Sequence, residues 1–178
     1  NGGATAVSGT QTRGVTITNS SFTSQTDRAL SLQGFNCDDG GLVLSKNNLL
    51  GANGNEAIYL EHFASAAIEG NFALFWTNAL KVKMTCLAGA GPTQFTVYGN
   101  QLEAGTGAAP GESSIWFDAT SYSGGNIAIV GNQLSNFGGS IPAVRLEAAG
   151  SNILFSTSVS NNVIGNAQGG CVYLKNMV

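Results

Sequence analysis

The chain has 178 residues and a formal net charge of −3 at pH 7, and only 10% of its residues are charged. A chain of this length is expected to form one domain with a continuous core. The acidic balance, with seven Lys and Arg residues scattered along the chain, argues against a nucleic-acid-binding surface. No apolar run approaches the roughly 18 residues that a membrane-spanning segment needs.

A two-part phrase recurs six times along the chain. Its first part is an aliphatic residue, followed three positions later by a polar residue and, in most copies, by an apolar residue two positions after that. The polar residues are, in chain order, Ser20, Asn47, Asn71, Asn100, Asn132 and Asn162. Successive copies are 27, 24, 29, 32 and 30 residues apart, and a period in this range indicates a solenoid.

The second part of the phrase is a short strand of four residues. The six copies are 29–32, 57–60, 79–82, 114–117, 143–146 and 171–174. Alternation along a strand places the second and fourth residues of each copy on one face and the third on the other. We therefore expect an inward column made of Leu30, Ile58, Leu80, Ile115, Val144 and Val172. Because the repeating units are strands, the solenoid is expected to be a β-helix.

The recurring Asn predicts a ladder at one bend of every turn. An Asn at a bend can adopt the left-handed conformation, and its amide can bond to the Asn of the next turn at a spacing of about 4.8 Å. The alternative is that these residues only mark turns between unrelated strands.

Residues 1–178 are expected to form a single β-helix domain, in which 1–13 are a partial first turn or a lead-in. Neither end carries a recognisable cap, and an uncapped solenoid exposes apolar interior and unpaired strand edges. We therefore expect a piece of a longer chain, or a subunit whose ends are covered by its neighbours.

The turn length, the inward aliphatic columns and the Asn at one bend resemble the pectin-lyase-like superfamily over about residues 14–175. That superfamily contains polysaccharide lyases, glycoside hydrolases, C5-epimerases and bacteriophage tailspikes. The resemblance implies an all-β fold, a single-stranded right-handed parallel β-helix of about six turns, and right-handed crossing is also the general rule. Low charge and many Ala and Gly residues look most like a tailspike. This implies a homotrimer in an extracellular or virion (phage tail) location that recognises a bacterial polysaccharide.

The third residue of each short strand is expected to face outward. These residues are Ser31, Tyr59, Lys81, Trp116, Arg145 and Tyr173. Aromatic rings stack on sugar rings, and Lys and Arg bind carboxylates or hydroxyls. The predicted substrate-binding residues are therefore Tyr59, Lys81, Trp116, Arg145 and Tyr173. Two alternatives remain open, since large residues suit a sheet centre and are also enriched in subunit interfaces.

A second exposed column follows these strands and contains Gln33, Glu61, Lys83, Asp118, Glu147 and Lys175. Asp118 and Glu147 are expected about 5 Å apart, and Glu61 and Asp118 about 9 to 10 Å apart. Retaining glycosidases need carboxyls about 5 to 5.5 Å apart and inverting ones about 6.5 to 9.5 Å. Glu61, Asp118 and Glu147 are therefore the catalytic candidates. The alternative is ion pairing across turns, between Glu61 and Lys83 or between Glu147 and Lys175.

No metal site or cofactor is expected, because two or three carboxylates do not supply the six to eight oxygens that Ca²⁺ takes. His62, the only histidine, is assigned no role. The three cysteines are expected to be reduced and structural, with Cys171 filling space in a column of small residues. The segments 103–113, 85–93 and 119–125 are expected to flank the sheet of short strands as loops.

The run Leu74-Phe75-Trp76 is too apolar for a solvated bend. If Phe75 or Trp76 points outward, it is expected to contribute to a homotrimer or to a contact with a missing part of the chain.

These patterns together predict a tailspike-like or secreted β-helix that binds a cell-surface polysaccharide. If it also cleaves the polymer, it is a glycoside hydrolase or a polysaccharide lyase. One alternative is a structural or adhesive module that trimerises without enzymatic activity, and another is a fragment of a lyase or epimerase. A binder needs its aromatic column open to solvent, whereas a spacer would bury that column against another subunit.

Overall fold

The computed structural model describes residues 3–35, 41–84, 93–105, 112–119, 125–138, 140–148 and 155–176. The regular elements in these ranges are all β-strands. They are β1 (Thr5–Gly9), β2 (Thr16–Thr18), β3 (Ser21–Gln25), β4 (Arg28–Gln33), β5 (Leu42–Ser45), β6 (Asn48–Glu61), β7 (Ser65–Glu69), β8 (Phe72–Lys83), β9 (Thr93–Tyr98), β10 (Gln101–Ala104), β11 (Ile115–Ala119), β12 (Gly125–Val130), β13 (Gln133–Asn136), β14 (Val144–Ala148), β15 (Phe155–Ser160), β16 (Val163–Gly165) and β17 (Val172–Lys175). None of the described segments is a helix long and apolar enough to span a membrane.

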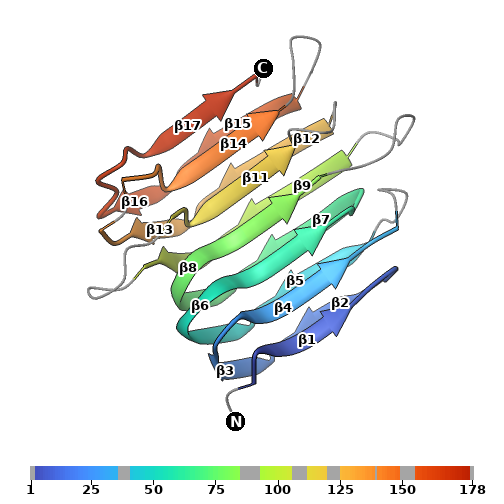
Figure 1. Cartoon of the computed structure of the whole chain (residues 1–178). Coiled ribbons are helices and arrows are strands. Elements are labelled where there is room, and N and C mark those ends of the chain that lie inside the picture. Colours follow the sequence, from blue (N-terminus) through green and yellow to red (C-terminus); the bar gives the residue numbers. More distant parts are fainter. Residues whose placement is uncertain are drawn as a thin grey trace.

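The strands stack as rungs from the blue N-terminal end to the red C-terminal end of Figure 1. One sheet has six strands in the order β15-β12-β9-β7-β5-β2, and the other has eleven strands. The paired strands of both sheets are parallel. The chain is thus a parallel β-solenoid of about six turns, which confirms the fold predicted from the repeat.

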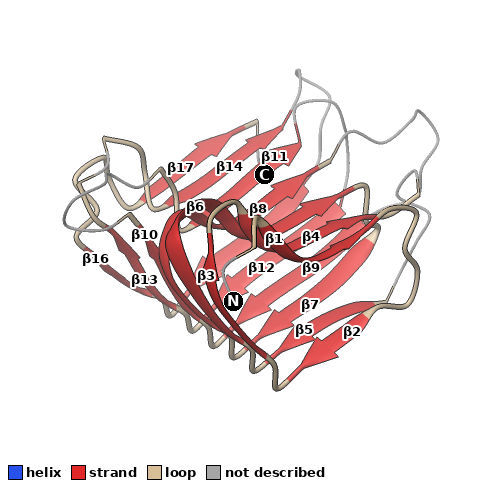
Figure 2. Ribbon diagram, turned by 60° about the horizontal axis from the view of Figure 1, so that its bottom comes forward, coloured by secondary structure: helices blue, strands red, loops and turns tan. Residues whose placement is uncertain are grey.

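The eleven-stranded sheet covers two sides of the solenoid, because β6 and β8 run without interruption around the bend between them (Figure 2). One side contains β3, β10, β13 and β16 with the first halves of β6 and β8. The other contains β1, β4, β11, β14 and β17 with the second halves of β6 and β8. We call this second side the charged face, because five of the seven Lys and Arg residues lie on its strands.

The inward column is confirmed on the charged face. Leu30, Ile58, Leu80, Ile115 and Val144 are aligned strand by strand and are fully buried. Burying a Leu, Ile or Val side chain contributes roughly 1.5 to 3 kcal/mol, so the stacked column is a main source of stability. Val172 continues the column in β17 but is 41% exposed.

The Asn ladder is also confirmed. The side-chain amide of each ladder Asn donates to the Oδ1 atom of the next, at 3.0 Å from Asn47 to Asn71 and 2.9 Å from Asn100 to Asn132. The same Oδ1 atoms accept backbone N–H groups, as Asn100 does from Asn71 at 2.8 Å. Each amide also donates to a backbone carbonyl one turn back, such as Asn100 to Ile68. The ladder therefore satisfies polar groups that the bend would otherwise leave buried and unpaired.

The expectation that the ladder Asn itself adopts the left-handed conformation is wrong. Positive φ angles occur one position earlier, and the residues are Asn19, Lys46, Gly70, Gly99, Gly131 and Asn161, with φ between 50° and 66°. Because this preceding residue turns the chain, the Asn that follows can point inward and reach two neighbouring turns. Four of the ladder Asn residues are accordingly only 1–2% exposed.

The apolar run in the third turn divides between the interior and the surface. Trp76 is 1% exposed, and its indole N–H donates to the carbonyl of Leu49 at 3.0 Å. Phe75 is 42% exposed and has a φ of 68°. The outward residue anticipated from the sequence is therefore Phe75, while Trp76 belongs to the core.

Candidate functional site

The charged face brings the predicted outward residues into two aligned columns. In the first, each of the residues Ser31, Tyr59, Lys81, Trp116, Arg145 and Tyr173 is the partner of the next across neighbouring strands. In the second, the same holds for Gln33, Glu61, Lys83, Asp118, Glu147 and Lys175. The charged face is therefore the part of the molecule on which a functional site is sought.

Cations lie against two of the three aromatic rings in the first column, those of Tyr59 and Trp116, while Tyr173 is 42% exposed. The guanidinium carbon of Arg28 lies 4.1 Å from the centre of the Tyr59 ring. Lys81 Nζ and the guanidinium carbon of Arg145 lie 4.0 and 4.5 Å from the Trp116 ring. Such cation–π contacts stabilise the stack by about 0.5 to 2 kcal/mol each. A sugar ring could stack on Trp116 only after one of the two cations moved aside.

Ion pairs hold Glu61 and Glu147, which the sequence proposed as catalytic carboxylates. Glu61 accepts a hydrogen bond from the Tyr59 hydroxyl at 3.1 Å and lies 3.2 Å from Lys83 Nζ. Glu147 is 8% exposed and pairs with Arg145 on its own strand at 2.9 Å. The pair between Glu61 and Lys83 is one of the cross-turn interactions that the sequence left open as an alternative.

The third carboxylate, Asp118, lies between Lys83 and Glu147 in the strand order. Asp118 and Glu147 are direct partners on adjacent strands, while Lys83 separates Glu61 from Asp118. The structure thus places the three acids on one edge, in the order that the repeat predicts, with a lysine among them.

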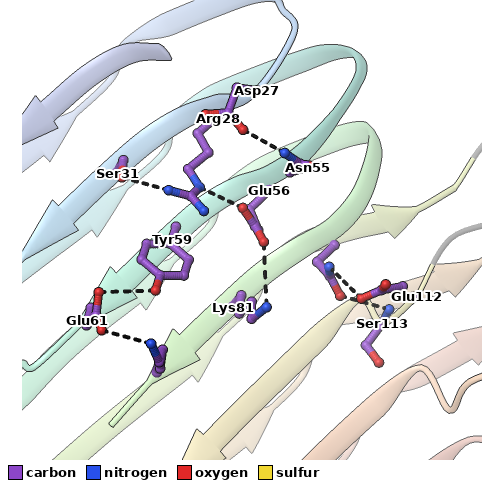
Figure 3. A network of polar contacts seen from close by, with 12 residues as sticks. Asp27, Arg28, Ser31, Asn55, Glu56, Tyr59, Glu61, Lys81, Glu112 and Ser113 are labelled. Carbon is purple, nitrogen blue, oxygen red and sulfur yellow. Dashed lines mark hydrogen bonds and ion pairs between the residues drawn. The ribbon is translucent and has the colours of Figure 1, made fainter. Parts of the chain in front are cut away.

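A second polar cluster lies at the start of the same strands (Figure 3). Arg28 Nε donates to Glu56 Oε2 at 2.7 Å, and Lys81 Nζ lies 3.8 Å from Glu56 Oε1. Burial alone would lower the pKa of Arg28, but the hydrogen bond and negative charge of Glu56, with the charge of Asp27, raise it above its usual value. Glu56 is only 5% exposed, so this cluster fixes Arg28 in place beside Tyr59.

A depression of about 370 Å³ lies on the first strands of the charged face. It forms because the outward column carries the small residues Ser8 and Ser31 on β1 and β4, before the large Tyr59 on β6. Its walls are Ser8, Gly9, Thr10, Arg28, Ser31, Leu32, Gln33, Tyr59 and Glu61. The depression therefore combines hydroxyls, an amide, a cation and a carboxylate beside one aromatic ring.

Tyr59 fixes the carboxylate at the edge of this depression. Burial, followed by the charge and hydrogen bond of Glu61, raises the pKa of Tyr59 to about 12. At neutral pH its hydroxyl is thus a donor that orients Glu61. His62 adds a contact at 3.6 Å to Glu61 Oε1, and its Nδ1 lies 3.4 Å from Gln33 Nε2. The lining of the depression therefore offers a ligand both hydrogen-bond donors, such as the Gln33 amide, and acceptors, such as the Glu61 carboxylate.

Sequence reasoning placed Tyr59 and Glu61 here but missed Arg28, Ser8 and the packing of His62. Arg28 comes just before the repeated four-residue strand. Alternation along the strand does not predict that its long side chain bends outward and lies over the Tyr59 ring. A usable signal was the pair of small residues in the outward column, since a small residue beside large ones makes a hollow.

In the part of the chain that the structure describes, no group of three or more His, Cys, Asp or Glu side chains could hold a metal ion. Cys171 is a free, exposed thiol in the last turn, so its side chain fills no buried space there. Cys37, Cys86 and the central parts of the expected loops 103–113, 85–93 and 119–125 lie outside the described residues.

Comparison of the chain with protein-family models, with curated proteins and with solved structures gives no significant match.

Proposed function

We propose that this β-solenoid binds a polysaccharide on its charged face, with the depression beside Tyr59 as the site that holds a sugar residue. The observation that carries this proposal is the 370 Å³ depression, in which Ser8, Ser31, Gln33 and Glu61 converge. Sugar hydroxyls both donate and accept hydrogen bonds, and such a mixed lining can satisfy them. The aligned polar columns beyond Tyr59 extend the surface along which further residues of a polymer would lie.

The proposed biological setting is that of the pectin-lyase-like β-helices, most like a bacteriophage tailspike domain in an extracellular or virion location. The parallel solenoid, the ladder and the low charge of the chain support this setting. We also propose that the chain works as a homotrimer or against the rest of a longer chain. Exposed apolar side chains support this, namely Phe75 at 42% and Leu174 at 51%.

Binding is favoured over cleavage for the carboxylates. Glu61 and Glu147 each lie within 3.2 Å of a cationic nitrogen on the same face, and such pairs explain their presence without chemistry. Hydrolysis or lysis by Glu61, Asp118 and Glu147 is therefore a secondary possibility, to be measured alongside binding.

A structural module is the second candidate function. It is favoured by the cation–π contacts of Trp116, because side chains that satisfy one another within the protein need no ligand. In this case the charged face would stiffen the stack and the chain would act as a spacer.

A glycan array distinguishes the two functions. Purified protein is tested beside Tyr59→Ala, which removes one wall of the depression, and Tyr98→Ala, which removes a 55% exposed tyrosine from the six-stranded sheet. A binder loses roughly tenfold or more of its affinity in Tyr59→Ala and keeps it in Tyr98→Ala. Absence of binding by the unmodified chain, or equal loss in both variants, contradicts the proposal. Release of reducing ends from any bound glycan, compared with Glu61→Gln, tests for cleavage.

A further inference from the structure

We infer that the depression beside Tyr59 accepts a single uncharged pyranose residue, so that the polysaccharide recognised there is neutral at this position. The inference rests on the proposed function and specifies its ligand. It follows from the size of the depression and from how its charged walls are already neutralised.

The size fits one sugar ring. A volume of about 370 Å³ is close to the lower end of the range of about 300 to 1,000 Å³ that is usual for small-molecule sites. Along β4 the floor runs from Ser31 to Gln33, and two residues of a strand span about 6.6 Å. Across the strands, Ser8, Ser31 and Tyr59 are neighbours in the same column, and Tyr59 closes that direction. The depression therefore has room for one ring with its hydroxyls.

The charge of the lining is balanced inside the protein. On one side, the cation Arg28 holds Glu56 at 2.7 Å. On the other, the carboxylate Glu61 is held by Lys83 at 3.2 Å and by the Tyr59 hydroxyl. An acidic sugar would bring a second negative charge next to Glu61, and a basic sugar would bring a second positive charge next to Arg28. Among the described residues that line the depression, neither ligand would gain an uncommitted counter-charge for the solvation that it loses, and this opposes binding.

Hydroxyl groups suit the same lining. A sugar hydroxyl can donate to an oxygen of Glu61 while another accepts from the Gln33 amide or from Arg28, whose Nη1 atom already reaches Ser31 Oγ at 3.5 Å. The hydroxyls of Ser8 and Ser31 can act in either role. Hydrogen bonds to charged partners are the stronger ones, so an uncharged ligand can gain affinity from both charged walls at once.

The test measures calorimetric binding of neutral oligosaccharides and of uronate-containing oligosaccharides to the whole chain, at about 50 and about 500 mM NaCl. We expect binding of a neutral oligosaccharide, with a dissociation constant that changes less than about twofold between the two salt concentrations. Binding of only acidic saccharides, or a loss of roughly tenfold at high salt, overturns the inference but leaves the proposed function standing. Absence of any saccharide binding overturns both.

Matched variants locate the site. Ser31→Tyr fills the depression from its floor, and Ser8→Tyr fills it from β1 should the first variant fail to fold. Ser158→Tyr places the same change at an exposed outward position of the six-stranded sheet. We expect affinity for the neutral oligosaccharide to fall roughly tenfold or more in the first two variants and to stay unchanged in the third. Unchanged affinity in a folded Ser31→Tyr or Ser8→Tyr chain overturns the placement of the sugar.

Discussion

At the residue scale, the contacts of Asn100 show what a ladder Asn does for its turn. Asn100 is 2% exposed, and its Oδ1 accepts both the backbone N–H and the amide of Asn71, at 2.8 and 3.0 Å. Its own amide donates to the Ile68 carbonyl at 2.8 Å and to Asn132 Oδ1 at 2.9 Å. Each of these partners is buried in the stack, so none can turn to solvent when Asn100 is removed.

Asn100→Ala is therefore expected to lower the free energy of unfolding by about 3 kcal/mol or more, because several buried donors and acceptors lose their partners. Chemical denaturation measures this change. Asn126→Ala, at an exposed position of β12, is the control and should change stability by about 0.5 kcal/mol or less. Similar losses in the two variants would mean that the ladder is not a source of stability.

Tyr59 gives the charged face a dependence on alkaline pH. Its pKa is raised to about 12 from a usual value of 10.0. A phenol with a raised pKa in the folded state adds stability that is complete below pH 10.0 and disappears as the pH rises through about 12. The free energy of unfolding of the unmodified chain should thus fall more steeply over this interval than that of Tyr59→Phe, which keeps the ring beside Arg28. If the free energy of unfolding depends on pH in the same way in both proteins, the raised pKa does not belong to Tyr59.

At the element scale, the bend within β6 depends on glycine. A Cβ atom at Gly51 would lie 2.6 Å from the Phe75 carbonyl oxygen and 2.7 Å from the Trp76 ring. A Cβ atom at Gly54 would lie 2.7 Å from the same ring. The register between β6 and β8 shifts between Leu50 and Gly54. The indole of Trp76 thus packs directly on the backbone of the neighbouring turn.

Gly51→Ala is expected to lower the free energy of unfolding by about 2 to 4 kcal/mol, because the buried indole of Trp76 and the backbone at Phe75 both have to move. Gly165→Ala in β16 is the control, since a Cβ atom there meets nothing within 4 Å. If the loss arises at Trp76, combining Gly51→Ala with Trp76→Leu should cost clearly less than the sum of the two single changes. Additive losses would place the effect elsewhere.

Elements also differ in how far the sequence predicts them. The six short strands of the charged face are correctly predicted because their inward residues are aliphatic and their outward residues are large or polar, as in Ala57-Ile58-Tyr59-Leu60. The continuous course of β6 through Ala52 and Asn53 is not predictable from alternation, because its bend interrupts the pattern. The left-handed residue was assigned one position too late, since the recurring Asn hides the varied residues before it, such as Lys46 and Gly70.

The candidate site was predicted only in part for a related reason. Which residues share an outward column depends on strand register, and the sequence repeat specifies the register. Tyr59 and Glu61 are therefore correctly predicted to align with their partners on β4 and β8. The course of a long side chain depends on packing between turns, which the repeat does not specify. Arg28 over the Tyr59 ring and the two cations against Trp116 are contacts of this kind. These contacts place cations against Tyr59 and Trp116, where the sequence predicted open aromatic faces, while Tyr173 stays 42% exposed.

At the scale of the whole molecule, charge is segregated by side. The central outward column of the six-stranded sheet contains only uncharged residues, namely Thr16, Val43, Ala67, Thr96, Ala128 and Ser158. The matching column of the charged face contains Lys81 and Arg145 between aromatic residues. A ligand that needs directed hydrogen bonds can therefore find them on the charged face, whereas the six-stranded sheet offers a flat and weakly polar surface.

Stability should also vary along the stack, because each turn of a solenoid contacts only its neighbours. Val144 and Val172 test this, since they are partners in the same inward column on adjacent strands. Val144 is fully buried between β11 and β17, whereas Val172 is 41% exposed and the described residues cover it from β14 only. In the chain without a partner, Val144→Ala should lower the free energy of unfolding by about 2 kcal/mol, and Val172→Ala by about 0.5 kcal/mol. If a partner covers the last turn, as proposed above, the cost of Val172→Ala should rise toward that of Val144→Ala.

Denaturation of both variants at several protein concentrations completes this test. If Val172→Ala costs as much as Val144→Ala, the last turn is covered in solution, and the gradient along the stack is absent. A cost that grows with protein concentration would identify another copy of the chain as the cover, because association stabilises the folded state by mass action. A small cost that is independent of concentration would establish that the stack loses its cooperativity toward β17, as nearest-neighbour coupling requires.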